Sequence, residues 1–137
     1  MRKVERSERM EEIAREVIEE HEDLSWIEED RIQIAYVVCD QEKKHQDRFV
    51  LGECKKADPT MKALAGCDFV VTFYEPNVRH FTDQQLRILM YHELLHAAIK
   101  NGSLAIEPHD YVVGEFRKIV EEYGADWAAE GSMRESE

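Results

Sequence analysis

The first part of the chain has the hydrophobic pattern of an amphipathic helix. Between Ser7 and about Leu24, apolar residues recur at intervals of three and four positions, and charged residues fill most of the other positions. A stripe with this period covers one face of a helix, so we expect this helix to cover a sheet. The residues of the stripe are Met10, Ile13, Ala14, Val17 and Ile18.

Strand patterns dominate the middle of the chain. In the segment 31–40 (RIQIAYVVCD), which is rich in β-branched residues, every second residue from Ile32 to Val38 is a large apolar one, as in a strand. After a polar connection, 48–57 (RFVLGECKKA) is expected to be its hairpin partner, with Gly52 marking a bulge. Turn residues around Pro59 then precede a short apolar element. The segment 67–75 (CDFVVTFYE) combines β-branched and aromatic residues and is the clearest strand.

A second helix is marked at both of its ends. Thr82 can cap its start, and Gln85, three positions later, completes a capping box. Gly102 supplies the usual stop signal at the other end. Between these signals the segment 86–99 (LRILMYHELLHAAI) is apolar on nearly every face, which indicates a helix enclosed by the rest of the domain.

The last helix is predicted from Asp110, which can cap it, to about Tyr123, with Gly124 ending it. The order of elements predicts an α+β fold. In this fold a small mixed or antiparallel sheet packs against the N-terminal helix and the central helix, and a C-terminal helix is added. We expect one domain over residues 1–127 and a flexible acidic tail at 128–137.

Composition and charge narrow the possible partners. The chain has 137 residues, 35% of them charged, and a net charge of -12. A surface this acidic repels polyphosphate backbones, which argues against a nucleic-acid partner. The chain contains no run of about 18 apolar residues, and its start, MRKVERSERM, lacks the apolar core of a secretory signal. We therefore expect no membrane insertion and a cytoplasmic location.

The segment YHELLHAAIK (91–100) places titratable side chains inside an apolar helix. His92 and His96 lie one turn apart on the same face, so their ring nitrogens can point at one metal ion. Glu93 lies about 100° around the helix from His92, near enough to contact a water on that metal without being a ligand. This is the HExxH arrangement of zinc peptidases. The alternative is that the three side chains form only ordinary hydrogen bonds or face solvent, but unpaired burial would be costly.

Each residue of the motif has a role in that chemistry. A catalytic Zn2+ ion takes three protein ligands and leaves one position open to water. The ion lowers the pKa of that water toward about 7 and polarises the substrate carbonyl. Glu93 would accept the water proton as general base and return it to the leaving amine as general acid.

A third metal ligand must come from another part of the chain. His109, thirteen positions after His96 and just before the last helix, is preferred because a glycine-containing loop can bring it back to the metal. Glu115, on the last helix, stays open as the alternative and would suit peptidases with a glutamate ligand. His80 is about 18 Å from His92 along the helix axis, which is too far without a sharp turn.

These parts follow one another in a recognisable order: the strand CDFVVTFYE, a short linker, YHELLHA, a glycine-containing loop, a PHD step, a Glu115–Phe116 pair and an aromatic end, YGADW. From about Arg31 to Trp127 the chain resembles the metallopeptidases of phages and bacterial mobile elements, small zincin-like proteins of about this length. The resemblance implies a zincin-like fold and peptidase chemistry, and therefore a peptide or protein substrate, but it does not identify that substrate. It also implies a Zn2+ ion held by His92, His96 and His109, with Glu93 as the catalytic residue.

Two other functions compete with a peptidase. The same fold could hold a metal for structure alone, or act as a phage accessory protein that binds a partner without turnover. The intact Glu93 weighs against this, because a structural site needs no base and tends to use four protein ligands. A metal-dependent nuclease is disfavoured by the net charge of -12 and because no lysine or arginine cluster adjoins the motif.

Overall fold

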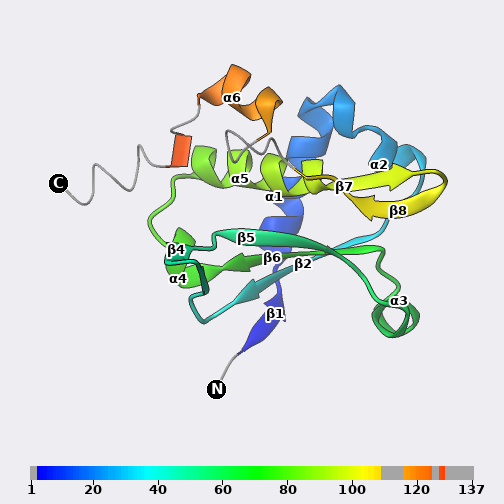
Figure 1. Ribbon diagram of the computed structural model, residues 1–137, viewed down its shortest axis with the longest axis horizontal. Helices are drawn as coiled ribbons and strands as arrows, with labels where there is room; N and C mark the ends of the chain where they lie inside the picture. The colour runs from blue at the N-terminus through cyan, green and yellow to red at the C-terminus, as the bar shows by residue number, and fades with distance from the viewer. Residues whose placement is uncertain (1–2, 109–115, 125–126, 129–137) are drawn as a thin grey trace.

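A mixed four-stranded sheet forms the centre of the structure, and helices α1 (Glu8–Glu20) and α5 (Asp83–His96) lie against one of its faces (Figure 1). This computed structural model describes residues 3–108, 116–124 and 127–128. The α+β class predicted from the sequence is confirmed. The strands of the sheet are β1 (Val4–Arg6), β2 (Ile34–Cys39), β5 (Gly52–Lys56) and β6 (Phe69–Tyr74), in the spatial order β1-β2-β6-β5.

Strand β6 lies inside the sheet, paired on both sides. It runs parallel to β2 and antiparallel to β5, while β1 runs antiparallel to β2. The hairpin predicted between 31–40 and 48–57 is therefore wrong, since β6 separates the two strands. Burial decides this order: the strand richest in large apolar residues takes an interior position, and its fully buried residues are Phe69, Val71 and Phe73.

Gly52 begins β5 and lies opposite Phe73 in an unbroken register that ends with Lys56 opposite Phe69. The bulge predicted at this glycine is therefore wrong. Strand β5 is an edge strand of the sheet and packs against α5. Gly52 lies at the start of this strand, next to Glu93 of α5.

Two short hairpins flank the sheet, β3 (Lys44–His45) with β4 (Arg48–Phe49) and β7 (Ala97–Lys100) with β8 (Ser103–Ile106). The second hairpin corrects the predicted end of the central helix, which is His96 and not Gly102. Asn101 and Gly102 have φ angles of 53° and 78°. Positive φ at both central residues is what a tight two-residue hairpin turn requires. The Asn-Gly pair therefore joins two strands instead of ending a helix.

Helix α5 (Asp83–His96) starts as the sequence predicts. The Thr82 hydroxyl accepts a hydrogen bond from the Gln85 backbone N–H, and the Gln85 side chain accepts one from the Thr82 N–H. Buried residues occur around its whole circumference, which confirms an enclosed helix. They are Gln85, Leu86, Ile88, Leu89, Met90, Tyr91, Glu93 and Leu94.

Helix α1 (Glu8–Glu20) confirms the predicted amphipathic helix, although it ends four residues before the predicted Leu24, and it packs on α5 and β2. Its cap is Ser7, whose hydroxyl accepts a hydrogen bond from the Met10 N–H at 3.1 Å. A 3-10 turn, η1 (Glu22–Leu24), and the short helix α2 (Trp26–Glu29) lead from it to β2.

Three short helices complete the described structure: α3 (Pro59–Ala65), α4 (Glu75–Val78) and α6 (Arg117–Tyr123). The turn expected around Pro59 is instead the start of α3, which takes in the short apolar element that follows, and the Asp58 side chain caps this helix at the Met61 N–H. Gly124 ends α6 as predicted.

The start predicted for the last helix is wrong. Phe116 has extended backbone angles, φ -72° and ψ 135°, so α6 begins only at Arg117. Asp110, the predicted cap, lies outside the described residues, as does the expected acidic tail after Ala128. Among the helices described, none has the length and apolar character needed to cross a membrane.

Candidate metal centre

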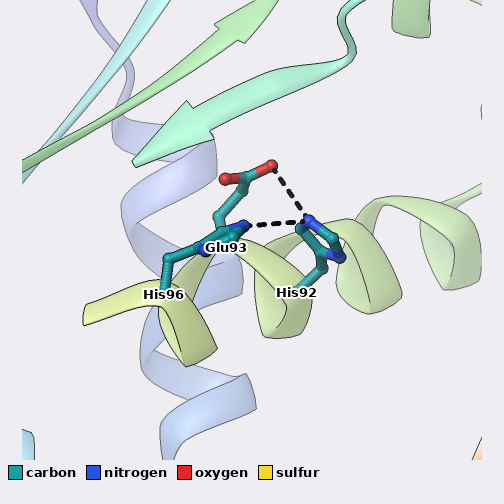
Figure 2. Close-up of side chains that lie close together, drawn as sticks. All are labelled: His92, Glu93 and His96. Atoms are coloured by element: carbon teal, nitrogen blue, oxygen red, sulfur yellow. Dashed lines mark hydrogen bonds and ion pairs between the residues drawn. The ribbon is translucent and has the colours of Figure 1, made fainter. Parts of the chain in front are cut away.

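Helix α5 carries His92, Glu93 and His96 in its last two turns, beside the edge strand of the sheet (Figure 2). Buried neighbours such as Met90 and Leu94 fix the rotation of the helix, and this rotation sets the direction in which its polar side chains point. The two histidines lie one turn apart, and Glu93 extends toward β5. Ligand atoms of the three residues lie within 4.8 Å of one another.

The two imidazole rings converge on one point. The Nε2 atoms of His92 and His96 are 3.2 Å apart, and the ring planes meet at 76°. Two nitrogen ligands of a tetrahedral zinc ion, each about 2.0–2.1 Å from the metal, are about 3.3–3.4 Å apart. The observed separation therefore fits two ligands of one tetrahedral ion.

A backbone hydrogen bond sets the tautomer of His96. Its Nδ1–H donates to the carbonyl oxygen of Glu107, with a distance of 2.7 Å. This leaves the Nε2 lone pair for a metal ion, the arrangement in which the second ring nitrogen of a histidine ligand is held by a backbone carbonyl. The Glu107 N–H donates in turn to the His96 carbonyl oxygen at 2.6 Å, so the residue that follows β8 is tied to the end of α5 twice.

Glu93 is 3% exposed, although carboxylates are seldom buried so fully. Its Oε2 is 4.0 Å from the Nε2 of His92 and would be 3.1 Å from a Cβ atom on Gly52. Burial and then the negative charge of Glu93 raise the pKa of the Cys54 thiol to about 12. The carboxylate of Glu93 therefore lies between the imidazole pair and β5.

Phe116 packs against both histidines. The centre of its ring is 5.4 Å from the centre of the His92 ring and 4.9 Å from that of His96, with edge-on geometry in both cases. The ring restricts the motion of both imidazoles and gives the site an apolar wall. Sequence reasoning did not assign Phe116 to the site, because nothing local indicates that the chain returns to the motif at this point.

The structure thus brings together three of the residues predicted for the site, His92, Glu93 and His96. His109 and Glu115, the two candidates for the third ligand, lie outside the described residues. His80 is exposed and does not belong to the cluster.

Comparison with known proteins identifies the family. A family model described as "Putative phage metallopeptidase" matches residues 2–133. No curated protein and no solved structure matches the chain significantly. The family match spans nearly all of the 137 residues and includes the sheet, the motif and α6. The chain therefore belongs to this family of phage metallopeptidases.

Proposed function

We propose that this protein is a zinc-dependent peptidase that hydrolyses peptide bonds in a peptide or protein substrate. The observation that supports this most is the 3.2 Å approach of the His92 and His96 Nε2 atoms beside the buried carboxylate of Glu93. A cation explains why an apolar helix carries these groups, because it offsets the cost of burying a carboxylate and two imidazoles together. Family membership supports the same chemistry.

The proposed ligands are His92 and His96 through Nε2, with a third from the segment 109–115. His109 remains our choice and Glu115 the alternative. Residues on both sides of this segment contact the histidines: the Glu107 carbonyl accepts from His96, and Phe116 packs on both rings. Because Glu107 and Phe116 both lie beside the imidazoles, a ligand supplied by the segment between them is within reach for a chain that spans about 3.3–3.6 Å per residue.

Zinc, when bound, supplies Lewis-acid chemistry that acidifies a water molecule and polarises a peptide carbonyl. The chain supplies the proton transfers. In this proposal the Oε2 of Glu93, 4.0 Å from the Nε2 of His92, accepts a proton from the attacking water and returns it to the leaving amine. Its burial keeps bulk water from competing with this proton transfer.

The proposed fold is zincin-like, with an edge strand, β5, beside the HExxH helix.

A polypeptide substrate suits the charge of the protein better than a nucleic acid does. The net charge of -12 repels a polyphosphate backbone but not an uncharged peptide.

The test uses the full chain and its Glu93→Gln variant. Metal analysis of the purified wild type should find about one zinc ion per chain, and incubation with a peptide library should give cleavage products detectable by mass spectrometry. Glu93→Gln should keep the zinc and lose the cleavage, because the amide preserves the shape of the side chain but cannot accept the proton.

Two controls separate this proposal from a structural metal site. His92→Ala should lose zinc as well as cleavage. A site closed by four protein ligands, seen by X-ray absorption of the zinc-loaded chain, together with no cleavage of any library peptide, would favour a binding module over a peptidase.

A further inference from the structure

Strand β5 passes so close to Glu93 that a side chain at Gly52 would be crowded. A Cβ atom built on Gly52 would lie 3.1 Å from the Oε2 of Glu93, 3.0 Å from the carbonyl oxygen of Thr72 and 3.4 Å from the Phe73 ring. Carbon and oxygen atoms that are not bonded to each other normally stay farther apart than the first two distances. A side chain at this position would therefore have to displace the carboxylate, the strand or both.

The backbone at Gly52 gives no other reason for a glycine. Its φ is not among the positive angles of the chain, and its register with Phe73 is that of an ordinary antiparallel pair. Glycine weakens a strand, and inside one it often marks the close approach of another group. At Gly52 the approaching groups are the Glu93 carboxylate and the Thr72 carbonyl oxygen.

We propose that Gly52 is a positioning residue for Glu93: the missing side chain leaves room for the carboxylate against β5 and fixes Oε2 in its orientation toward the histidine pair. The catalytic part of this inference rests on the proposed peptidase function, whereas the contact itself does not.

Two further observations support the inference. The Oε2 atom that a Cβ on Gly52 would contact is the same atom that lies 4.0 Å from the Nε2 of His92. A side chain on β5 that displaced Oε2 would therefore change the distance between the Glu93 carboxylate and the imidazole rings. In addition, Cys54 lies two residues along the same face of β5, and its thiol experiences the charge of Glu93 after the larger effect of burial. This charge effect on Cys54 agrees with a Glu93 carboxylate that lies close to β5.

The first experiment is a double-mutant cycle on thermal stability, measured on metal-free protein. The four chains are wild type, Gly52→Ala, Glu93→Ala and the double variant. In the wild-type background the new methyl group meets both Oε2 and the Thr72 carbonyl oxygen, whereas in the Glu93→Ala background it meets only the latter. We expect Gly52→Ala to lower the melting temperature several degrees more in the first background, because the contact with Thr72 cancels in the cycle.

Equal losses of melting temperature in the two backgrounds would overturn the inference, because only the contact with the neighbouring strand β6 would then require a glycine at this position. The same conclusion would follow if Gly52→Ala failed to fold in both backgrounds. Folding of the double variant but not of Gly52→Ala would be the strongest support. Since this cycle needs neither zinc nor substrate, its result is independent of whether the proposed function is right.

The second experiment measures kinetics on the zinc-loaded enzyme. Gly52→Ala should bind zinc with unchanged stoichiometry and KM but lose roughly tenfold or more in kcat, since a misplacement of about 1 Å can cost two orders of magnitude. A matched control is Lys55→Ala, on the same strand with its side chain exposed, which should keep kcat. An unchanged kcat in Gly52→Ala would exclude the positioning role even if the stability cycle showed the contact.

Discussion

The imidazole ring of His21 stacks on the phenol ring of Tyr91, with ring centroids 3.8 Å apart and planes at 23°. Tyr91 immediately precedes His92, and its hydroxyl donates to Asp23 Oδ2 at 2.8 Å. The Lys118 ammonium donates to the same Asp23 oxygen at 2.9 Å. The turn after α1, the helix α5 and the helix α6 are therefore joined directly beside the proposed metal ligand His92.

The Asp23 junction should make stability depend on pH in the acid range. Burial raises the pKa of Asp23, but the hydrogen bonds from Lys118 and Tyr91 together lower it by more than burial raises it. The pKa of Asp23 in the folded chain therefore lies below its ordinary value. A carboxylate with a depressed pKa adds stability above its unfolded pKa, about 3.9, and that contribution is lost as the pH falls through the folded value.

Tyr91→Phe removes one of these hydrogen bonds and should lower the free energy of unfolding by about 1 kcal/mol at pH 7. The loss should shrink at about pH 3, which lies below the unfolded pKa of Asp23 and approaches its lower folded pKa, because a protonated carboxyl group accepts a weaker hydrogen bond. Urea titrations at the two pH values measure the difference. A loss of equal size at both pH values would mean that the hydrogen bond to Asp23 does not account for the effect.

The third ligand can be identified by zinc content. His109→Ala should lose most of the bound zinc, because two histidines alone hold the ion weakly, whereas Glu115→Ala should keep about one zinc per chain. Equilibrium dialysis followed by metal analysis is the measurement. The opposite result, with zinc retained in His109→Ala and lost in Glu115→Ala, would assign the ligand to the glutamate.

Phe116 should tune zinc affinity although it cannot bind the metal. Phe116→Ala frees the two imidazoles that its ring restricts, and we expect the zinc Kd to rise about tenfold, in the range known for residues that orient metal ligands. Competition with a chromogenic chelator gives the Kd. The matched control is Phe49→Ala on β4, where the ring is 54% exposed and the Kd should not change.

The β7–β8 turn should be coupled to the metal centre through Glu107. Gly102 has φ 78° and Gly66 has φ 71°, and a Cβ atom at either position meets no atom within 4 Å. Replacing either glycine by alanine should therefore lower the free energy of unfolding by about 1 kcal/mol through backbone strain alone. Gly102→Ala should also weaken zinc binding several-fold, because it disturbs the hairpin that brings Glu107 to His96, whereas Gly66→Ala should leave the zinc Kd unchanged. Equal zinc affinities in the two variants would show that the hairpin is not coupled to the site.

The sequence predicts the elements whose signals are local. Ser7 and the Thr82–Gln85 capping box mark the starts of α1 and α5 because a cap involves residues only three positions apart. The pairing of His92 with His96 follows from the helical period in the same way. Local signals fail where one residue type serves two structures, as at Gly102, which ends helices and also completes hairpin turns.

What the sequence by itself determined is therefore the type and start of the main helices, the clearest strand and the three residues of the motif. The tertiary structure alone decided the strand order, the place of Gly52 against Glu93, the bond from His96 to Glu107 and the return of Phe116 to the histidines. The physical reason is that these contacts join segments more than ten residues apart. They depend on which apolar surfaces the whole chain can bury together, and no short stretch of sequence carries that information.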